Sequence, residues 1–270
     1  MATHRDNVFL LVISLILGFS TSLLIKITPN DLDLYLGAYD LFWSGQNPYS
    51  INLWQKFWNS PTTPPMVWNP PELFIILIPI KVIHSFGLWA TSTVFILLSF
   101  HTTYLLYRTI NKGSPSLFNI IIFSLLNVSV LSCYFHSQIS IFLSWLLAIS
   151  INCFSKRGDR IAGLVAALTL IKPHIFGPAL LVITLGSIKE RRFQFSISVI
   201  ICLSALSLIT EILSPGIHHL WAFRETWPTN FYGATLFSLL TFIMWQYSEI
   251  DFRALGSISI ALLLFYYLII

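Results

Sequence analysis

Charged residues are scarce in this sequence of 270 amino acids, of which 10% are Asp, Glu, Lys or Arg and 56% are hydrophobic. A soluble globular protein needs about 25% charged residues to cover its surface. The mean hydropathy of +0.77 is high, and several apolar stretches reach the length of about 17–25 residues that crosses a bilayer. These values exclude a soluble globule and predict an all-α, polytopic membrane protein.

Cysteine is scarce too, with three residues in the chain: Cys133, Cys153 and Cys202. They lie in or beside apolar runs without metal-ligand spacing, so the sequence supports neither a disulfide framework nor a zinc site. No basic patch is interleaved with aromatic residues, as a nucleic-acid surface would require. We therefore expect no cofactor, no metal and no nucleic-acid partner, and we attribute the net charge of +4 to cytoplasmic anchoring residues.

The chain also lacks an internal repeat, a low-complexity linker and a loop long enough for a soluble domain. We expect a single transmembrane domain over residues 1–270, with longer polar stretches at 28–71 and 214–230. The first apolar run, Val8–Ile27, has no small-residue cleavage site behind it and predicts an uncleaved span. The last run, Ala261–Ile270, has no flanking cation, which is compatible with a C-terminal truncation.

About nine apolar segments are predicted to span the membrane, near residues 8–27, 88–107, 117–133, 138–154, 159–171, 174–187, 194–213, 231–247 and 254–270. A further segment, 72–86, is interrupted by Pro79 and Lys81, and its uninterrupted core is too short to cross. We expect it to be re-entrant or interfacial. Because Pro173 separates the short segments 159–171 and 174–187, we expect a helical hairpin there, which is tolerated among other helices or beside a wet cavity.

The distribution of Lys and Arg supports the re-entrant interpretation, because basic residues near span ends favour the cytoplasm. A full crossing by 72–86 would leave four of these residues inside and eleven outside. A re-entrant segment reverses the balance to ten inside and five outside, and the ten are Arg5, Arg108, Lys112, Lys156, Arg157, Arg160, Lys189, Arg191, Arg192 and Arg253. We therefore expect a plasma-membrane protein with a cytoplasmic N-terminus and with its short polar motifs on the outer face.

Two carboxylates, Asp31 and Asp33, follow the first span directly. A carboxylate at the bilayer surface serves well as a general base for a hydroxyl that attacks an electrophile held at the membrane. The structural alternative is that Asn30 or Asp31 caps the next helix while Asp33 lies in its first turn. Both interpretations hold together if each carboxylate has one role.

Lys172 is the sharpest single candidate, since a lysine at the turn of a membrane hairpin is costly unless it is paired, hydrated or bound to an anion. A lipid-linked phosphate would supply that anion, and a lysine that snorkels to the headgroups is the alternative. Arg224, His218 and His219, in the last outer stretch, are further candidates for binding the phosphate. Histidines in exposed loops are often bystanders, so that alternative stays open.

Other outer-face residues are candidate substrate contacts: Tyr35, Asn47, Tyr49, Asn69, Gln138, His174 and Asn230. Apolar and aromatic positions between Leu34 and Phe42 recur at helical spacing, which predicts a helix along the interface. Its aromatic residues either stack on a sugar or lie at headgroup level. Gln138 either contacts substrate or caps the helix that it begins.

The order of these motifs resembles the polyprenol-phosphate-dependent GT-C glycosyltransferases of family 87, which include α-mannosyltransferases. The resemblance covers roughly residues 8–240 and is carried by Asp31-x-x-x-Tyr35-x-x-Ala38, Gly45-x-Asn-Pro-Tyr49, Trp68-Asn-Pro-Pro71, Ser137-Gln138, Ala162-Gly163 leading into Lys172-Pro173, and Pro228-x-Asn230. The family often has Tyr-Pro-Pro where this chain has Asn69-Pro-Pro, and Gly-Gln-x-Asn where it has Ser137-Gln-Ile-Ser140. The missing Asn weakens the expectation of a substrate contact in that last motif.

The resemblance implies a GT-C helix bundle that takes a hexose or pentose, for instance mannose, from a polyprenyl phosphate. The acceptor would be a hydroxyl of a glycan or glycolipid, and the configuration would invert. By motif position Asp31 would be the catalytic base, and Lys172 or Arg224 would neutralise the leaving phosphate. Two other interpretations stay open: a transporter or flippase with Lys172 in its substrate site, and a non-catalytic lipid-binding subunit.

Overall fold

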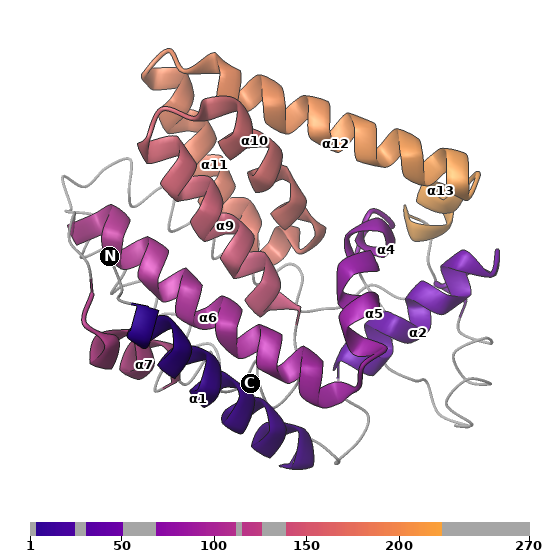
Figure 1. Cartoon of the computed structure of the whole chain (residues 1–270). Coiled ribbons are helices and arrows are strands. Elements are labelled where there is room, and N and C mark those ends of the chain that lie inside the picture. The colour runs from indigo at the N-terminus through magenta and orange to yellow at the C-terminus, as the bar shows by residue number, and fades with distance from the viewer. Residues whose placement is uncertain (1–3, 25–30, 51–68, 112–114, 126–138, 223–270) are drawn as a thin grey trace, which may run out of the picture.

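The computed structural model describes residues 4–24, 31–50, 69–111, 115–125 and 139–222 (Figure 1). Every regular element in these ranges is a helix, which confirms the predicted all-α class. In chain order the elements are α1 (His4–Leu24), α2 (Asp31–Trp43), α4 (Leu73–Ile76), α5 (Ile78–His84), α6 (Leu88–Asn111), α7 (Leu117–Leu125), α9 (Ser140–Ser155), α10 (Asp159–Ala167), the 3-10 helix η1 (Leu168–Ile171), α11 (Pro173–Lys189), α12 (Phe193–Leu213) and α13 (Ile217–Ala222).

Helices occupy the predicted apolar segments where the structure describes them. The segment 159–171 forms α10 and η1, and 194–213 lies within α12. The segment 117–133 is described to residue 125, and 231–247 and 254–270 lie outside the described residues. Within the described part of the chain, α12 alone is both long and apolar enough to cross a membrane. Nine spans and a GT-C arrangement therefore stay predictions.

The surface of α12 suits a hydrocarbon environment. Ile197, Ile200, Leu208 and Ile212 are each more than half exposed, although isoleucine and leucine are usually among the most buried residue types. A continuous exposed apolar surface of this kind marks contact with a membrane or a partner. This finding supports membrane association of the chain at the level of this helix.

The segment 72–86 does not form one continuous helix, as the sequence predicted from the interruptions at Pro79 and Lys81. It forms two helices of 4 and 7 residues, α4 and α5, which together measure about 17 Å at 1.5 Å per residue. The hydrocarbon layer is about 30 Å thick. At Gly87 the backbone takes a left-handed conformation (φ 106°) and leads into α6. The segment is therefore too short to cross, and its placement in a bilayer stays a prediction.

The chain reverses direction at Lys172, as predicted for a hairpin. The α9–α10 turn and the α11–α12 turn lie side by side, because Arg192 donates hydrogen bonds to Asp159 and to the carbonyl oxygen of Phe154. The residues between these turns, 159–192, therefore run away from this end of the bundle and return to it. Lys172 lies between η1 and α11, at the opposite end.

Two glycines allow adjacent helices to approach closely. A Cβ atom at Gly163 of α10 would overlap the carbonyl oxygen of Phe195 and lie 2.8 Å from the Cβ of Ser198, both on α12. A Cβ atom at Gly18 of α1 would overlap Thr93 of α6 in the same way. Small residues at helix contacts are the usual means of close packing in membranes.

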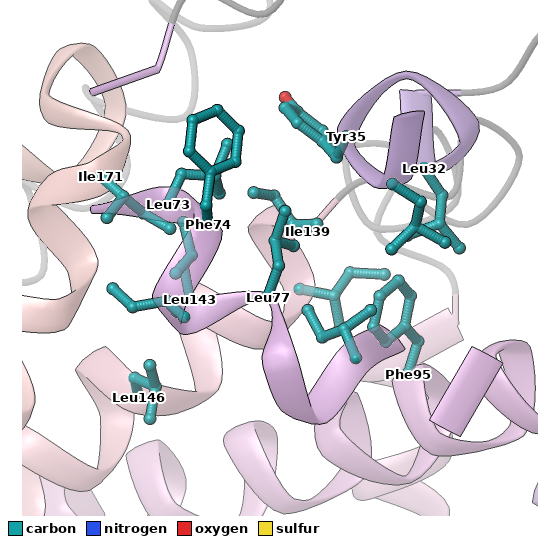
Figure 2. Close-up of a cluster of buried hydrophobic side chains, with 14 of the residues drawn as sticks. Leu32, Tyr35, Leu73, Phe74, Leu77, Phe95, Ile139, Leu143, Leu146 and Ile171 are labelled. Carbon is teal, nitrogen blue, oxygen red and sulfur yellow. The ribbon is translucent and has the colours of Figure 1, made fainter. Parts of the chain in front are cut away.

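The main hydrophobic core lies where α2, α4, α6, α9 and η1 meet. Figure 2 shows side chains from these elements converging around Phe74 and Leu77, which are fully buried. Phe74 stacks on Phe42 with 4.8 Å between ring centroids. Because Tyr35 and Ile171 belong to the same core, this packing brings α2 next to the residue that precedes Lys172.

Candidate functional site

Lys172 is a buried cation, 4% exposed. Its ammonium donates a hydrogen bond to the hydroxyl of Ser140 at 3.0 Å and lies 5.2 Å from the ring centroid of Tyr35. Among the described residues no carboxylate forms an ion pair with it. An ammonium has three N–H donors, and an isolated buried charge is costly. The arrangement is therefore suited to binding an anion.

Helix α11 adds to the positive potential at this point. Lys172 is the N-cap residue of the helix, and Pro173 occupies its first turn. The N-terminus of a helix carries a partial positive charge, equivalent to about half an elementary charge, and it favours anions. The helix dipole and the buried ammonium therefore act in the same direction.

A chain of hydrogen bonds holds the loop before α4 against the Lys172 end of η1. The Tyr49 hydroxyl donates to the carbonyl oxygen of Asn69 at 2.9 Å, and the Asn69 amide donates to the carbonyl oxygen of Ile171 at 2.6 Å. Asn47 accepts the backbone N–H of Tyr49 at 2.9 Å, which makes a local turn of the kind that Asn favours. Asn47, Tyr49 and Asn69, predicted as substrate contacts, thus brace the neighbourhood of Lys172.

A second polar cluster lies on the other side of the same loop, where α13 lies beside α4 (Figure 1). The Glu72 carboxylate is 3.0 Å from the Nε2 atom of His218 and accepts a hydrogen bond from Ser207 of α12. The Nδ1 atom of His218 is 2.7 Å from the Glu211 carboxylate. We call Glu72, His218 and Glu211 the imidazole clasp.

The imidazole clasp favours the protonated form of His218. Partial burial lowers the pKa of this imidazole, but hydrogen bonds to Glu211 and Glu72 and the charges of both carboxylates outweigh that effect and raise the pKa overall. Carboxylates only accept hydrogen bonds, so both ring nitrogens are satisfied only when both carry a proton. In the protonated form that these contacts favour, His218 links the N-cap residue of α4 with α12 and α13.

The remaining predicted residues fall into two groups. Asp33 is half-buried in the first turn of α2, and His219 is exposed on α13. Asp33 thus occupies the position that the helix-capping alternative predicted. Outside the described residues lie the side chains of Asp31 and His174, and the whole of Gln138, Arg224 and Asn230.

Sequence reasoning missed Ser140, Glu72 and Glu211. Ser140 accepts a hydrogen bond from the ammonium of Lys172. Glu72 and Glu211 each interrupt or adjoin a long apolar run. An ionisable residue in such a run indicates a paired or functional group, so this signal was sufficient to single out both glutamates.

No group of three His, Cys, Asp or Glu side chains in the described ranges is placed to hold a metal ion. In the imidazole clasp the carboxylates lie against opposite nitrogens of His218, so the three groups bracket the ring instead of converging on one point. Comparison with known proteins finds no match to a protein-family model, a curated protein or a solved structure. Function is therefore inferred from the arrangement of these residues.

Proposed function

We propose that the chain is an integral membrane glycosyltransferase resembling the GT-C enzymes of family 87. It would move a sugar, a hexose such as mannose, from a polyprenyl phosphate to a hydroxyl of a glycan or glycolipid on the outer face. The observation that carries the proposal is the buried ammonium of Lys172, which has a hydroxyl and an aromatic ring beside it but no carboxylate among the described residues. A phosphate monoester or diester complements the Lys172 ammonium in charge and in hydrogen-bonding capacity.

The reaction uses Lys172 to stabilise charge that develops on the leaving group. The acceptor oxygen attacks the anomeric carbon as the bond from that carbon to the phosphate oxygen breaks, and the electron pair leaves with the polyprenyl phosphate. Fixed donors aimed at developing charge are worth about 10²–10³ in kcat. Lys172, which is 4% exposed, and the N-terminus of α11 would supply such donors.

A general base completes the reaction by taking the proton of the acceptor hydroxyl. The register of α2 favours Asp31 over Asp33 for this role. Asp31 precedes Tyr35 by four residues, which is about one helical turn, whereas Asp33 precedes it by two and lies on another face. Because Tyr35 contacts Lys172, the Asp31 position is the one aligned with the anion site.

The imidazole clasp has a positioning role in this scheme. Both nitrogens of His218 are engaged by carboxylates, so the imidazolium has no N–H donor left for a donor phosphate. Glu72 follows Asn69 by three residues, and the clasp holds one end of this loop while Asn69 holds the other against Ile171. His218 thus supports the shape of the anion site from outside it.

The test is transfer of labelled hexose from a polyprenyl-phosphate donor by the purified full chain. We expect Lys172→Met to lower kcat by about 10²–10³, and Asp31→Asn to lower it by about 10²–10⁴ because general-base catalysis contributes in that range. Lys81→Met is the matched control, since Lys81 pairs with Asp40 at 2.7 Å on the surface. It should keep wild-type turnover.

The outcomes separate the three interpretations. Turnover that depends on Lys172 and Asp31 but not on Lys81 supports the transferase. Donor binding that Lys172→Met abolishes, without turnover by any preparation, contradicts the transferase and favours the transporter or lipid-binding interpretation. Equal donor binding by wild type and Lys172→Met would refute the anion site itself.

A further inference from the structure

A patch of exposed cations lies at the end of the bundle opposite to Lys172. It consists of Lys156 and Arg157 in the α9–α10 turn, Arg160 at the start of α10, Lys189 at the end of α11 and Arg191 in the α11–α12 turn. All are exposed, and none forms an ion pair with another described residue. We call these five residues the double-turn patch.

Arg192 joins the two turns into one surface. Arg192 lies 9% exposed between them and pairs with Asp159 of α10. Its guanidinium also lies 3.5 Å from the ring centroid of Phe154 on α9. Counting Arg192, segments 156–160 and 189–192 carry six cations against two carboxylates, Asp159 and Glu190. This surplus of four equals the net charge of the whole chain.

Both turns place an arginine where a glycine is the usual residue. The N–H of Gly158 bonds to the carbonyl oxygen of Cys153, and that of Arg157 bonds to Phe154, which is the Schellman pattern at a helix end. The α11–α12 turn repeats the pattern. The backbone N–H of Arg192 donates to the carbonyl oxygen of Ser187, and the backbone N–H of Arg191 donates to the carbonyl oxygen of Ile188.

The arginine at the equivalent position of each turn has a left-handed backbone, with φ of 64° at Arg157 and 58° at Arg191. They are the two non-glycine residues with positive φ in the described part of the chain. A left-handed conformation is unfavourable for a residue with a Cβ atom and costs glycine nothing. Strained positions of this kind cluster where they serve function.

The surroundings of the double-turn patch indicate the partner. Ile161, Ile188, Phe193 and Ile197 adjoin it and are 45% to 60% exposed. Cations directly beside exposed apolar side chains match the boundary between the headgroups and the hydrocarbon of a bilayer. We propose that the double-turn patch is a binding site for the phosphate headgroups of anionic phospholipids. This inference does not depend on the proposed sugar transfer.

The experiment measures the thermal unfolding midpoint of the full chain in nanodiscs of phosphatidylcholine alone or with increasing phosphatidylglycerol. We expect phosphatidylglycerol to raise the midpoint of the wild type. The double variant Arg157→Gly/Arg191→Gly lacks two surface cations, each of which raises the affinity for anionic lipid about fivefold. Its unfolding midpoint should therefore reach half of its maximal rise only with roughly 25-fold more phosphatidylglycerol than the wild type needs. In phosphatidylcholine alone the same variant should melt a few degrees higher than the wild type, since both left-handed arginines are gone.

Two controls isolate the charge. Arg157→Lys/Arg191→Lys keeps both cations and both strained positions, so it should respond to phosphatidylglycerol like the wild type. Arg108→Gln removes an exposed cation of α6 outside the patch and should leave the response unchanged. The proposal is overturned if the double glycine variant keeps the wild-type response, or if inorganic phosphate in phosphatidylcholine nanodiscs reproduces it.

Discussion

Neutralising His218 should weaken the fold selectively at low pH. In the imidazole clasp the charged ring lies between Glu72, 11% exposed at its side chain, and Glu211, 44% exposed. We expect His218→Gln to retain one weak hydrogen bond and to lose the ionic component. Hydrogen bonds to charged groups contribute about 1.5–3 kcal/mol, and solvent screening on the Glu211 side reduces this contribution.

We therefore expect a loss of about 1–2 kcal/mol in the free energy of unfolding, carried mainly by the Glu72 contact. For a chain of this size each kcal/mol lowers Tm by about 2–4 °C. The expected shift is thus roughly 2–8 °C at pH 6, measured by thermal unfolding in a neutral detergent or nanodisc. His219→Gln, one residue along α13 and exposed, is the matched control and should change Tm little.

The pH dependence gives the stronger test. The pKa of His218 is raised in the folded state above its ordinary value, so the folded state holds this proton more tightly than the unfolded chain does. The stabilisation is fully present below about pH 6.5, the pKa of an unperturbed histidine, and is lost as the pH rises through the folded-state pKa. The difference in Tm between wild type and His218→Gln should therefore shrink from pH 6 to pH 9. A difference that stays constant over this range would refute the charged clasp.

Four further variants test the packing of α10 on α12 and the bracing of the proposed anion site. Gly163→Ala should destabilise by about 1–3 kcal/mol through overpacking of α10 on α12, whereas Gly177→Ala, where no atom lies within 4 Å of the added Cβ, should be neutral or slightly stabilising in thermal unfolding. Asn69→Ala should cost about 1–3 kcal/mol in the free energy of unfolding and also weaken binding of a polyprenyl-phosphate donor through the displaced loop. Tyr49→Phe removes one hydrogen bond to that loop and should cost about 1 kcal/mol, with a smaller loss of donor binding. Equal donor binding by Asn69→Ala and wild type would contradict the bracing role.

The helical fold could be predicted well because its signals are local. The apolar segment 159–171, which Pro173 separates from the next one, was predicted as a unit, and the structure ends η1 at Ile171. The broken segment around Pro79 was predicted for the same reason, since proline limits the helix that it enters. The membrane spans are different, because helix length and composition single out α12 alone among the described residues.

The candidate site could be predicted only in part, because its contacts join distant positions. Lys172 was recognised from its own cost in an apolar environment. Its neighbours Tyr35 and Ser140 come from other helices, and no local pattern specifies those contacts. His218 was recognised as well, but its partner Glu72 lies 146 positions away. The sequence alone therefore could not show whether His218 is a bystander, a phosphate ligand or part of the clasp.

The two proposed binding sites lie at opposite ends of the helices α9–α12. One end carries the double-turn patch, where the cations are exposed and two of the five have a left-handed backbone, and the other end carries the buried cation Lys172. Surface charges near a membrane contribute about 1 kcal/mol each, whereas a buried charge without a counterion is far more costly. The buried position therefore requires the greater structural support. The loop from Asn69 to Glu72 supplies it, because its two ends are fixed to η1 and to α13 by contacts that span 102 and 146 residues of sequence.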